Sequence, residues 1–179
     1  IYNRVVIDEL EKKGWTLPFD YRDELNVEWS SHPNWFWMWS KYSMPFLDHP
    51  AVPRASLLSE LESLPADLET RYVLKPLFSF AGGGVNVEPT REDLDRIPEN
   101  ERSSWCLQEK IEYAPGLLIP TGEGVKVEVR MMFLKPPDVA EPVLSLNLCR
   151  LSRGKLHGVD WNKNFTWVGS SVGLWADEG

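Results

Sequence analysis

The stretch at residues 73–87 constrains the fold of this 179-residue chain more than any other, and it reads VLKPLFSFAGGGVNV. Its first part predicts a strand that ends at Lys75 and Pro76, and a second strand is expected after the glycines, at 85–88. Glycine reaches positive φ without steric cost, so the three glycines at 82–84 can turn their amide N–H groups toward an anion. The stretch therefore predicts a hairpin tip that can hold a polyphosphate above a lysine, and an ordinary surface turn is the alternative.

Composition excludes several classes of function. The formal net charge of -8 argues against a nucleic-acid partner or an anionic membrane. Cys106 and Cys149 are the only cysteines and show no metal or disulfide spacing, so we expect a cytoplasmic protein. No apolar run approaches the roughly 18 residues of a membrane span. Because the chain opens on Ile1 inside an expected helix, we also expect it to be a piece of a longer protein.

Hydrophobic periodicity predicts an α+β protein, with a helical first third before a mostly antiparallel sheet. Helices are expected at 2–13, at 33–41, at 56–64 with Ser56 as N-cap, and at 90–97, where Thr90 and Asp93 form a capping box. Strands are expected at 71–75, 85–88, 105–111, 124–134 and 143–151.

Aromatic residues crowd the segment around residues 35–39. Trp35, Phe36, Trp37 and Trp39 would cover most of the circumference of a helix there, so we expect them to be buried between two lobes. Exposed tryptophans stack on sugars, which leaves a carbohydrate-binding protein as an alternative function.

Two later segments carry side chains suited to nucleotide chemistry. The strand end at 108–111 is typical of a hinge whose backbone pairs with an adenine base, and an ordinary strand end is the alternative. Glu128 and Arg130 project to one face of a strand, where a carboxylate suits a metal and a guanidinium suits a phosphate. The alternative is a solvated ion pair worth at most about 1 kcal/mol.

The last third adds cationic and oxygen-bearing side chains. Arg150 is followed by Asp160, Asn162 and Asn164, whose oxygens are hard donors of the kind that Mg²⁺ accepts. Asparagines in a loop also form turns, which is the alternative reading of this segment.

Taken in this order, the segments from about residue 40 to 173 resemble the ATP-grasp superfamily. The resemblance implies an ATP-grasp fold, with two lobes of mostly antiparallel sheet and helices, incomplete in this chain. Residues 1–40 would end a preceding domain or form an aromatic lead-in, and 41–179 would be the nucleotide-binding region. The first forty residues look like those of uncharacterised bacterial members, related to glutathionylspermidine-synthase-like proteins.

The resemblance implies ATP and Mg²⁺ as cofactors and assigns residues to them. The residues that would bind ATP are Lys41, Lys75, Phe80, Ala81, Gly82, Gly83, Gly84, Gln108, Glu109, Lys110 and Ile111. The metal ligands would be Glu128, Asp160, Asn162 and Asn164, and the catalytic residues would be Arg130 and Arg150.

The implied activity is that of a ligase. ATP would phosphorylate the carboxylate of a small molecule or peptide, and an amine or thiol would displace phosphate from the acylphosphate. One departure concerns the metal strand, because no Glu-x-Asn follows Asn164. Either that strand lies beyond residue 179, or Asp160 and Asn162 replace it, or catalysis is lost. A non-catalytic nucleotide-binding module is therefore the alternative to a ligase, and the oligomeric state is not predicted.

Overall fold

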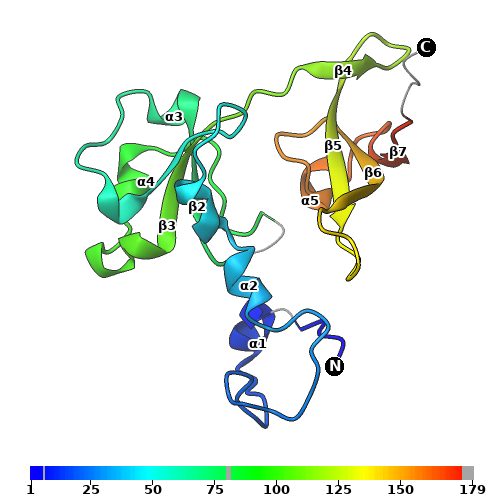
Figure 1. Cartoon of the computed structure of the whole chain (residues 1–179). Helices are drawn as coiled ribbons and strands as arrows, with labels where there is room; N and C mark the ends of the chain where they lie inside the picture. Colours follow the sequence, from blue (N-terminus) through cyan, green and yellow to red (C-terminus); the bar gives the residue numbers. More distant parts are fainter. Residues whose placement is uncertain (6, 80–81, 175–179) are drawn as a thin grey trace. The chain divides into compact units, whose positions relative to one another are not determined.

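The computed structural model describes residues 1–5, 7–79 and 82–174, and the chain divides into two compact units. Unit 1 spans Ile1–Ile111 and unit 2 spans Glu112–Gly179 (Figure 1). Both units are built around antiparallel sheets with short helices, so the α+β class is confirmed. The boundary expected at residue 40 separates a lead-in segment from the nucleotide-binding region and differs from the division after Ile111, so it stays a prediction.

Unit 1 is a three-stranded antiparallel sheet with short helical elements around it, in the strand order β1-β3-β2. Its strands are β1 (Ala55–Leu57), β2 (Tyr72–Pro76) and β3 (Trp105–Glu109), and its α-helices are α1 (Ile7–Lys13), α2 (Trp35–Met38), α3 (Leu68–Arg71) and α4 (Arg91–Asp95). The 3-10 helices are η1 (Lys41–Phe46), η2 (Leu58–Glu60) and η3 (Glu99–Ser104). β3 is the central strand, which places its residues next to both β1 and β2.

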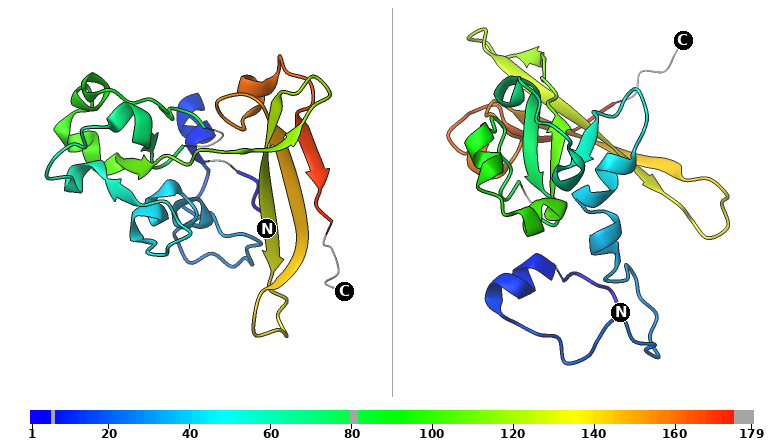
Figure 2. Two further views of the ribbon diagram at one scale, coloured as in Figure 1. Left: turned by 90° about the horizontal axis from the view of Figure 1, so that it is seen from above. Right: turned by 90° about the vertical axis from the view of Figure 1, so that its left-hand side faces the viewer.

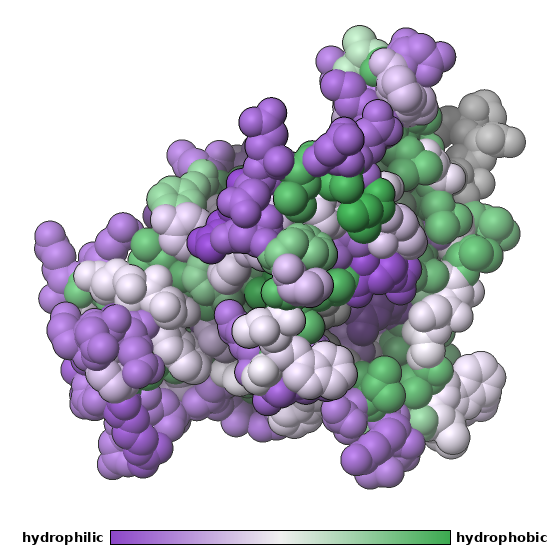
Figure 3. All heavy atoms as spheres, turned by 90° about the horizontal axis from the view of Figure 1, so that it is seen from below, coloured by the Kyte–Doolittle hydropathy of each residue, from purple (hydrophilic) through white to green (hydrophobic). Residues whose placement is uncertain are grey.

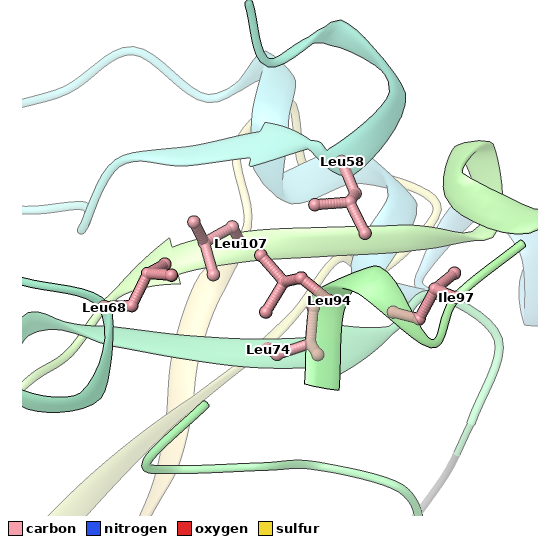
Figure 4. Close-up of a cluster of buried hydrophobic side chains, with 6 residues drawn as sticks. All are labelled: Leu58, Leu68, Leu74, Leu94, Ile97 and Leu107. Atoms are coloured by element: carbon pink, nitrogen blue, oxygen red, sulfur yellow. The ribbon is translucent and has the colours of Figure 1, made fainter. Parts of the chain in front are cut away.

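One face of this sheet carries the main core of unit 1. Six buried aliphatic side chains form it, namely Leu58, Leu68, Leu74, Leu94, Ile97 and Leu107 (Figure 4). The expected capping box holds α4 against them: the Thr90 hydroxyl accepts the Asp93 N–H, and the Asp93 carboxylate accepts the Thr90 N–H. The opposite face, which carries Leu57 and Cys106, is the one from which Lys75 projects.

Unit 2 is a four-stranded antiparallel sheet in the order β4-β5-β6-β7. Its elements are β4 (Pro115–Leu118), β5 (Gly124–Leu134), β6 (Val143–Ser152), α5 (Val159–Asn162) and β7 (Gly169–Val172). β5 and β6 form one long hairpin, which Figure 2 shows in two further views. The alternating residues of 124–134 predicted β5 with its observed bounds.

Unit 2 buries few apolar residues. Among its described residues only Ile119 and Val125 are buried aliphatics, whereas Val129 and Met131 are about half exposed. Apolar side chains also lie open on the face of the molecule that Figure 3 shows, where they appear green among hydrophilic residues.

The helix expected at 33–41 is reduced to the short α2, with the 3-10 helix η1 after it, and three other expected elements are also wrong or reduced. The helix expected at 56–64 is instead β1 followed by η2, because Ser56 pairs with Leu107 of the central strand. The strand expected at 85–88 is a single bridge between Asn86 and Leu74. The first helix begins only at Ile7, after a bridge from Tyr2 to the chain near residue 30. In each of these three cases a partner distant in sequence decides the backbone.

The aromatic segment also differs from the prediction. Trp35 is 44% exposed and Trp39 is 75% exposed, so the expected burial of these tryptophans is wrong. Their indole rings instead stack on each other, with centroids 5.5 Å apart and planes within 9° of parallel. Trp37 contacts Phe78, edge to face, at a centroid distance of 4.9 Å, and this anchors the segment to the chain just before the glycine loop.

Candidate functional site

Lys75 lies near the end of β2, directly opposite Cys106 of β3. Residues that face each other across an antiparallel pair project to the same side, as do residues two apart on one strand. Lys75, Cys106 and Gln108 therefore share one face of the sheet. On that face the Lys75 ammonium donates a hydrogen bond to the side-chain oxygen of Gln108.

Among the described residues, no carboxylate forms an ion pair with the positive charge of Lys75. The side chain is half-buried, and within the part of the chain that the structure describes it forms no ion pair. Burial lowers the pKa of Lys75 and raises the pKa of the Cys106 thiol. The thiol is therefore neutral at pH 7 and cannot compensate the ammonium. A half-buried cation held only by neutral groups favours the binding of an anion.

Lys41 connects the aromatic segment to the glycine loop. It opens η1, whose N-cap Ser40 accepts the Tyr42 N–H, and its own N–H donates to the Leu77 carbonyl at 3.2 Å. Its ammonium donates to both the carbonyl and the hydroxyl of Ser79, the latter at 2.9 Å. Both predicted phosphate-binding lysines are thus in unit 1, and Lys41 contacts the segment that directly follows Lys75 and Pro76 along the chain.

Ser79 was not singled out in the sequence, although it lies inside the glycine-rich stretch. Its hydroxyl accepts a hydrogen bond from Lys41 and donates one to the Gly83 carbonyl at 2.8 Å. This side chain therefore joins the first lysine to the far side of the loop. A serine three residues before the first glycine of such a loop is the signal that could have found it.

The loop itself uses the conformational freedom of glycine at two positions. Gly82 has a φ of +79° and Gly84 a φ of +69°, both in the left-handed region that side chains disfavour. A Cβ atom on Gly84 would also lie 3.0 Å from Cγ of Pro76. The predicted loop residues Phe80 and Ala81 lie outside the described residues.

The predicted hinge follows Gln108 at the end of β3. The Glu109 N–H donates to the Arg54 carbonyl at 2.8 Å, and the Lys110 N–H donates to the Arg71 carbonyl at 2.7 Å. These two amides are therefore engaged with unit 1 itself, and Ile111 is 54% exposed. A role for this segment in binding adenine stays a prediction.

The predicted catalytic arginines lie together in unit 2. Glu128 accepts hydrogen bonds from Arg130 at 2.6 Å and from Arg150 at 3.3 Å, and Arg150 also donates to the His157 carbonyl at 2.7 Å. Burial opposes ionisation of Glu128, but the hydrogen bond and charge of Arg130, with the charge of Arg150, give the carboxyl a lowered net pKa. Glu128 is thus an anion that holds two guanidinium groups on one face of β5 and β6.

His157 packs beside this cluster. Its ring lies edge to face with Tyr113, at a centroid distance of 4.7 Å, and its buried ring nitrogens have no hydrogen-bond partner in the described residues. Burial and the charges of Arg150, Lys126 and Arg130 lower its pKa against the opposite effect of Glu128. The histidine is therefore neutral at pH 7, and no pattern in the sequence predicted its packing.

The remaining predicted metal ligands are dispersed. Asn162 is 5% exposed, and its oxygen accepts the N–H groups of Arg153 and Gly154, both at 2.9 Å. Asp160 and Asn164 are exposed. No group of three or more acidic, histidine or cysteine side chains arranged to hold a metal occurs among the described residues. The assignment of Mg²⁺ to this set stays a prediction.

Across residues 1–5, 7–79 and 82–174, no helix has both the length and the apolar character that crossing a membrane requires. No protein-family model, curated protein or solved structure matches the chain.

Proposed function

We propose that the chain is the nucleotide-binding part of an ATP-dependent ligase, which joins a carboxylate to an amine or thiol through an acylphosphate. The observation that carries the proposal is the uncompensated charge of Lys75. It lies at the base of a glycine-rich loop, and a second lysine, Lys41, is hydrogen-bonded to the same loop through Ser79. The chain as a whole has a net charge of -8, so this concentration of cations is local.

In this proposal unit 1 binds the phosphates of ATP. Lys75 and Lys41 would neutralise the α- and β-phosphates, and the amides at 82–84 would cover the β- and γ-phosphates. The phosphates would bind to the donors of the Lys75 ammonium that Gln108 leaves unused. Positioning and charge neutralisation account for most of the catalysis of phosphoryl transfer, so no covalent role for the protein is needed.

Unit 2, taken by itself, presents two cationic side chains that suit an anionic group. Arg130 and Arg150 are held by Glu128, and Arg150 also by the His157 carbonyl, so each guanidinium would suit a phosphoryl or carboxylate group. Glu128 is engaged with both arginines, and among the described residues no group of three or more acidic, histidine or cysteine side chains is arranged to hold Mg²⁺.

The test is a comparison of ATP affinity in two lysine variants by titration calorimetry. We expect Lys75→Ala to weaken binding by about tenfold or more, because it removes a partly desolvated charge from the phosphates. Lys13→Ala is the matched control, since Lys13 pairs with Glu9 on the exposed surface of α1. It should change the affinity by less than about twofold. Unchanged ATP affinity in Lys75→Ala would refute the proposal.

An assay of ATP turnover by the wild-type protein distinguishes a ligase from a non-catalytic nucleotide-binding module. Release of ADP and phosphate on adding ATP, Mg²⁺ and mixed carboxylates and amines supports turnover, whereas binding without phosphate release supports the module. Wild-type affinity should also fall as the pH rises through the lowered pKa of Lys75, because the ammonium loses its charge there.

A second candidate function, carbohydrate binding, is favoured by the exposed tryptophan pair. Trp39 is 75% exposed and stacks on Trp35, so its outer face is open to the apolar face of a sugar ring. Glycans that quench tryptophan fluorescence in the wild type, but not in Trp39→Ala, would support this function. Quenching by ATP alone would count against it.

A further inference from the structure

Gln108 lies in the centre of the unit 1 sheet. It pairs with Ala55 of β1 on one side and with Val73 of β2 on the other, and it is 3% exposed. Buried side chains of glutamine are uncommon and need hydrogen-bond partners. The partner here is Lys75, which reaches Gln108 diagonally across the face of the sheet.

The chemistry of this partner matters because it is neutral. An amide oxygen satisfies the ammonium of Lys75 without cancelling its charge. A carboxylate in the same place would make a buried ion pair and neutralise the lysine. The neighbouring Cys106 thiol is also uncharged, since burial raises its pKa. Gln108 accepts a hydrogen bond from Lys75 and Cys106 lies opposite it on the neighbouring strand, and neither group carries a charge that would cancel the ammonium.

We propose that Gln108 is a positioning residue that holds Lys75 through a neutral oxygen, so that the full charge of the lysine stays available to a phosphoryl anion. This role differs from a contact of the 108–111 backbone with adenine, because it uses the side chain and acts through Lys75. The inference rests on the proposed function of Lys75, and it adds the residue that keeps the site selective for anions.

The decisive variant is Gln108→Glu, which keeps the shape of the side chain and adds one negative charge. We expect it to weaken binding of ATP and of inorganic pyrophosphate by about tenfold or more, because the carboxylate neutralises Lys75 and repels the ligand. Asn100→Asp is the matched control. It adds the same charge at an exposed position of unit 1 and should change the affinity by less than about twofold.

A second variant, Gln108→Met, tests the same inference if Gln108→Glu does not fold. Gln108→Met has a similar length, carries no charge and offers no strong acceptor. It should keep the attraction for anions but lose the orientation of Lys75, with an affinity about threefold weaker. Wild-type affinity in every folded Gln108 variant would overturn the inference.

A direct readout separates this inference from the proposed function. The ammonium of Lys75 can be titrated by NMR of the labelled protein without any ligand. Gln108→Glu should raise the pKa of Lys75, whereas Asn100→Asp should leave it unchanged. If the wild type binds neither ATP nor pyrophosphate, the proposed function fails. The titration of Lys75 then decides by itself whether Gln108 holds the lysine. A raised pKa then supports the contact with Gln108, and an unchanged one refutes it.

Discussion

Replacing Asn162 with alanine removes the side chain that holds the loop after β6. The amide oxygen accepts two backbone N–H groups, from Arg153 and Gly154, and the amide nitrogen donates to the carbonyls of Leu156 and Gly158, at 2.7 and 2.9 Å. All four bonds connect to backbone between residues 153 and 158. The substitution therefore removes four hydrogen bonds at once, and of the four backbone groups the Gly158 carbonyl still accepts the Trp161 N–H at 3.2 Å.

The cost follows from how deeply each group is buried. The Gly154 bond is buried, and an orphaned buried amide costs about 2 kcal/mol. The other three bonds are partly buried, so water can replace them at about 0.5 kcal/mol each. The sum for unit 2 is about 3.5 kcal/mol. At 1.4 kcal/mol per decade, this is a loss of more than about 100-fold in the protection of local amides.

Two measurements check this value. Urea unfolding followed by circular dichroism should show a lower midpoint, and hydrogen exchange of the Arg153 and Gly154 amides should accelerate. Asn164→Ala is the matched control, because Asn164 is exposed, and it should leave both unchanged. Equal stability of Asn162→Ala and wild type would refute the reasoning. A loss that appears only when Mg²⁺ is present would instead support a ligand role for Asn162.

Two further predictions concern unit 1. Leu94→Ala should lower the free energy of unfolding by about 2 to 5 kcal/mol in urea, because Leu94 is 1% exposed in the main core; a loss below about 1 kcal/mol would contradict the packing described. Hydrogen bonds from the Thr90 backbone, the Thr90 hydroxyl and Asn86 lower the pKa of Asp93. The stability that these bonds contribute is fully present above the ordinary Asp93 pKa of 3.8, and it is lost as the pH falls through the lowered pKa of the folded protein. Acid titration of stability should therefore be less steep in Asp93→Asn than in the wild type, and equal slopes would argue against it.

Part of the candidate site follows from the sequence. The run of glycines after Lys75 and Pro76 predicted a loop with left-handed residues, and Gly82 and Gly84 adopt them. Glu128 and Arg130 were expected on one face of a strand, and they form an ion pair there. Spacing of two or a few residues is enough for such predictions, because the geometry of a strand or a turn is local.

Other parts of the site depend on distant residues. Gln108 is 33 positions from Lys75, and Ser79 is 38 positions from Lys41, so no local pattern could pair them. Asn162 resembled a metal ligand in the sequence, but the structure shows its oxygen bound to two backbone amides. An asparagine has the same donors and acceptors in both roles, and only its neighbours separate them.

The sequence by itself determined the elements whose pattern is strong and local. These are the long β5–β6 hairpin, β2, β3 and the capping box of α4. Tertiary structure decided the conformation of segments whose local pattern was overridden by a distant partner. The leucine-rich segment at 56–64 forms β1 and a 3-10 helix, because the edge of β3 was available for pairing. Tertiary structure also left Trp39 exposed and put a neutral Gln108 against Lys75. Backbone pairing and desolvation act between residues far apart in the chain, and a sequence read in short windows does not contain them.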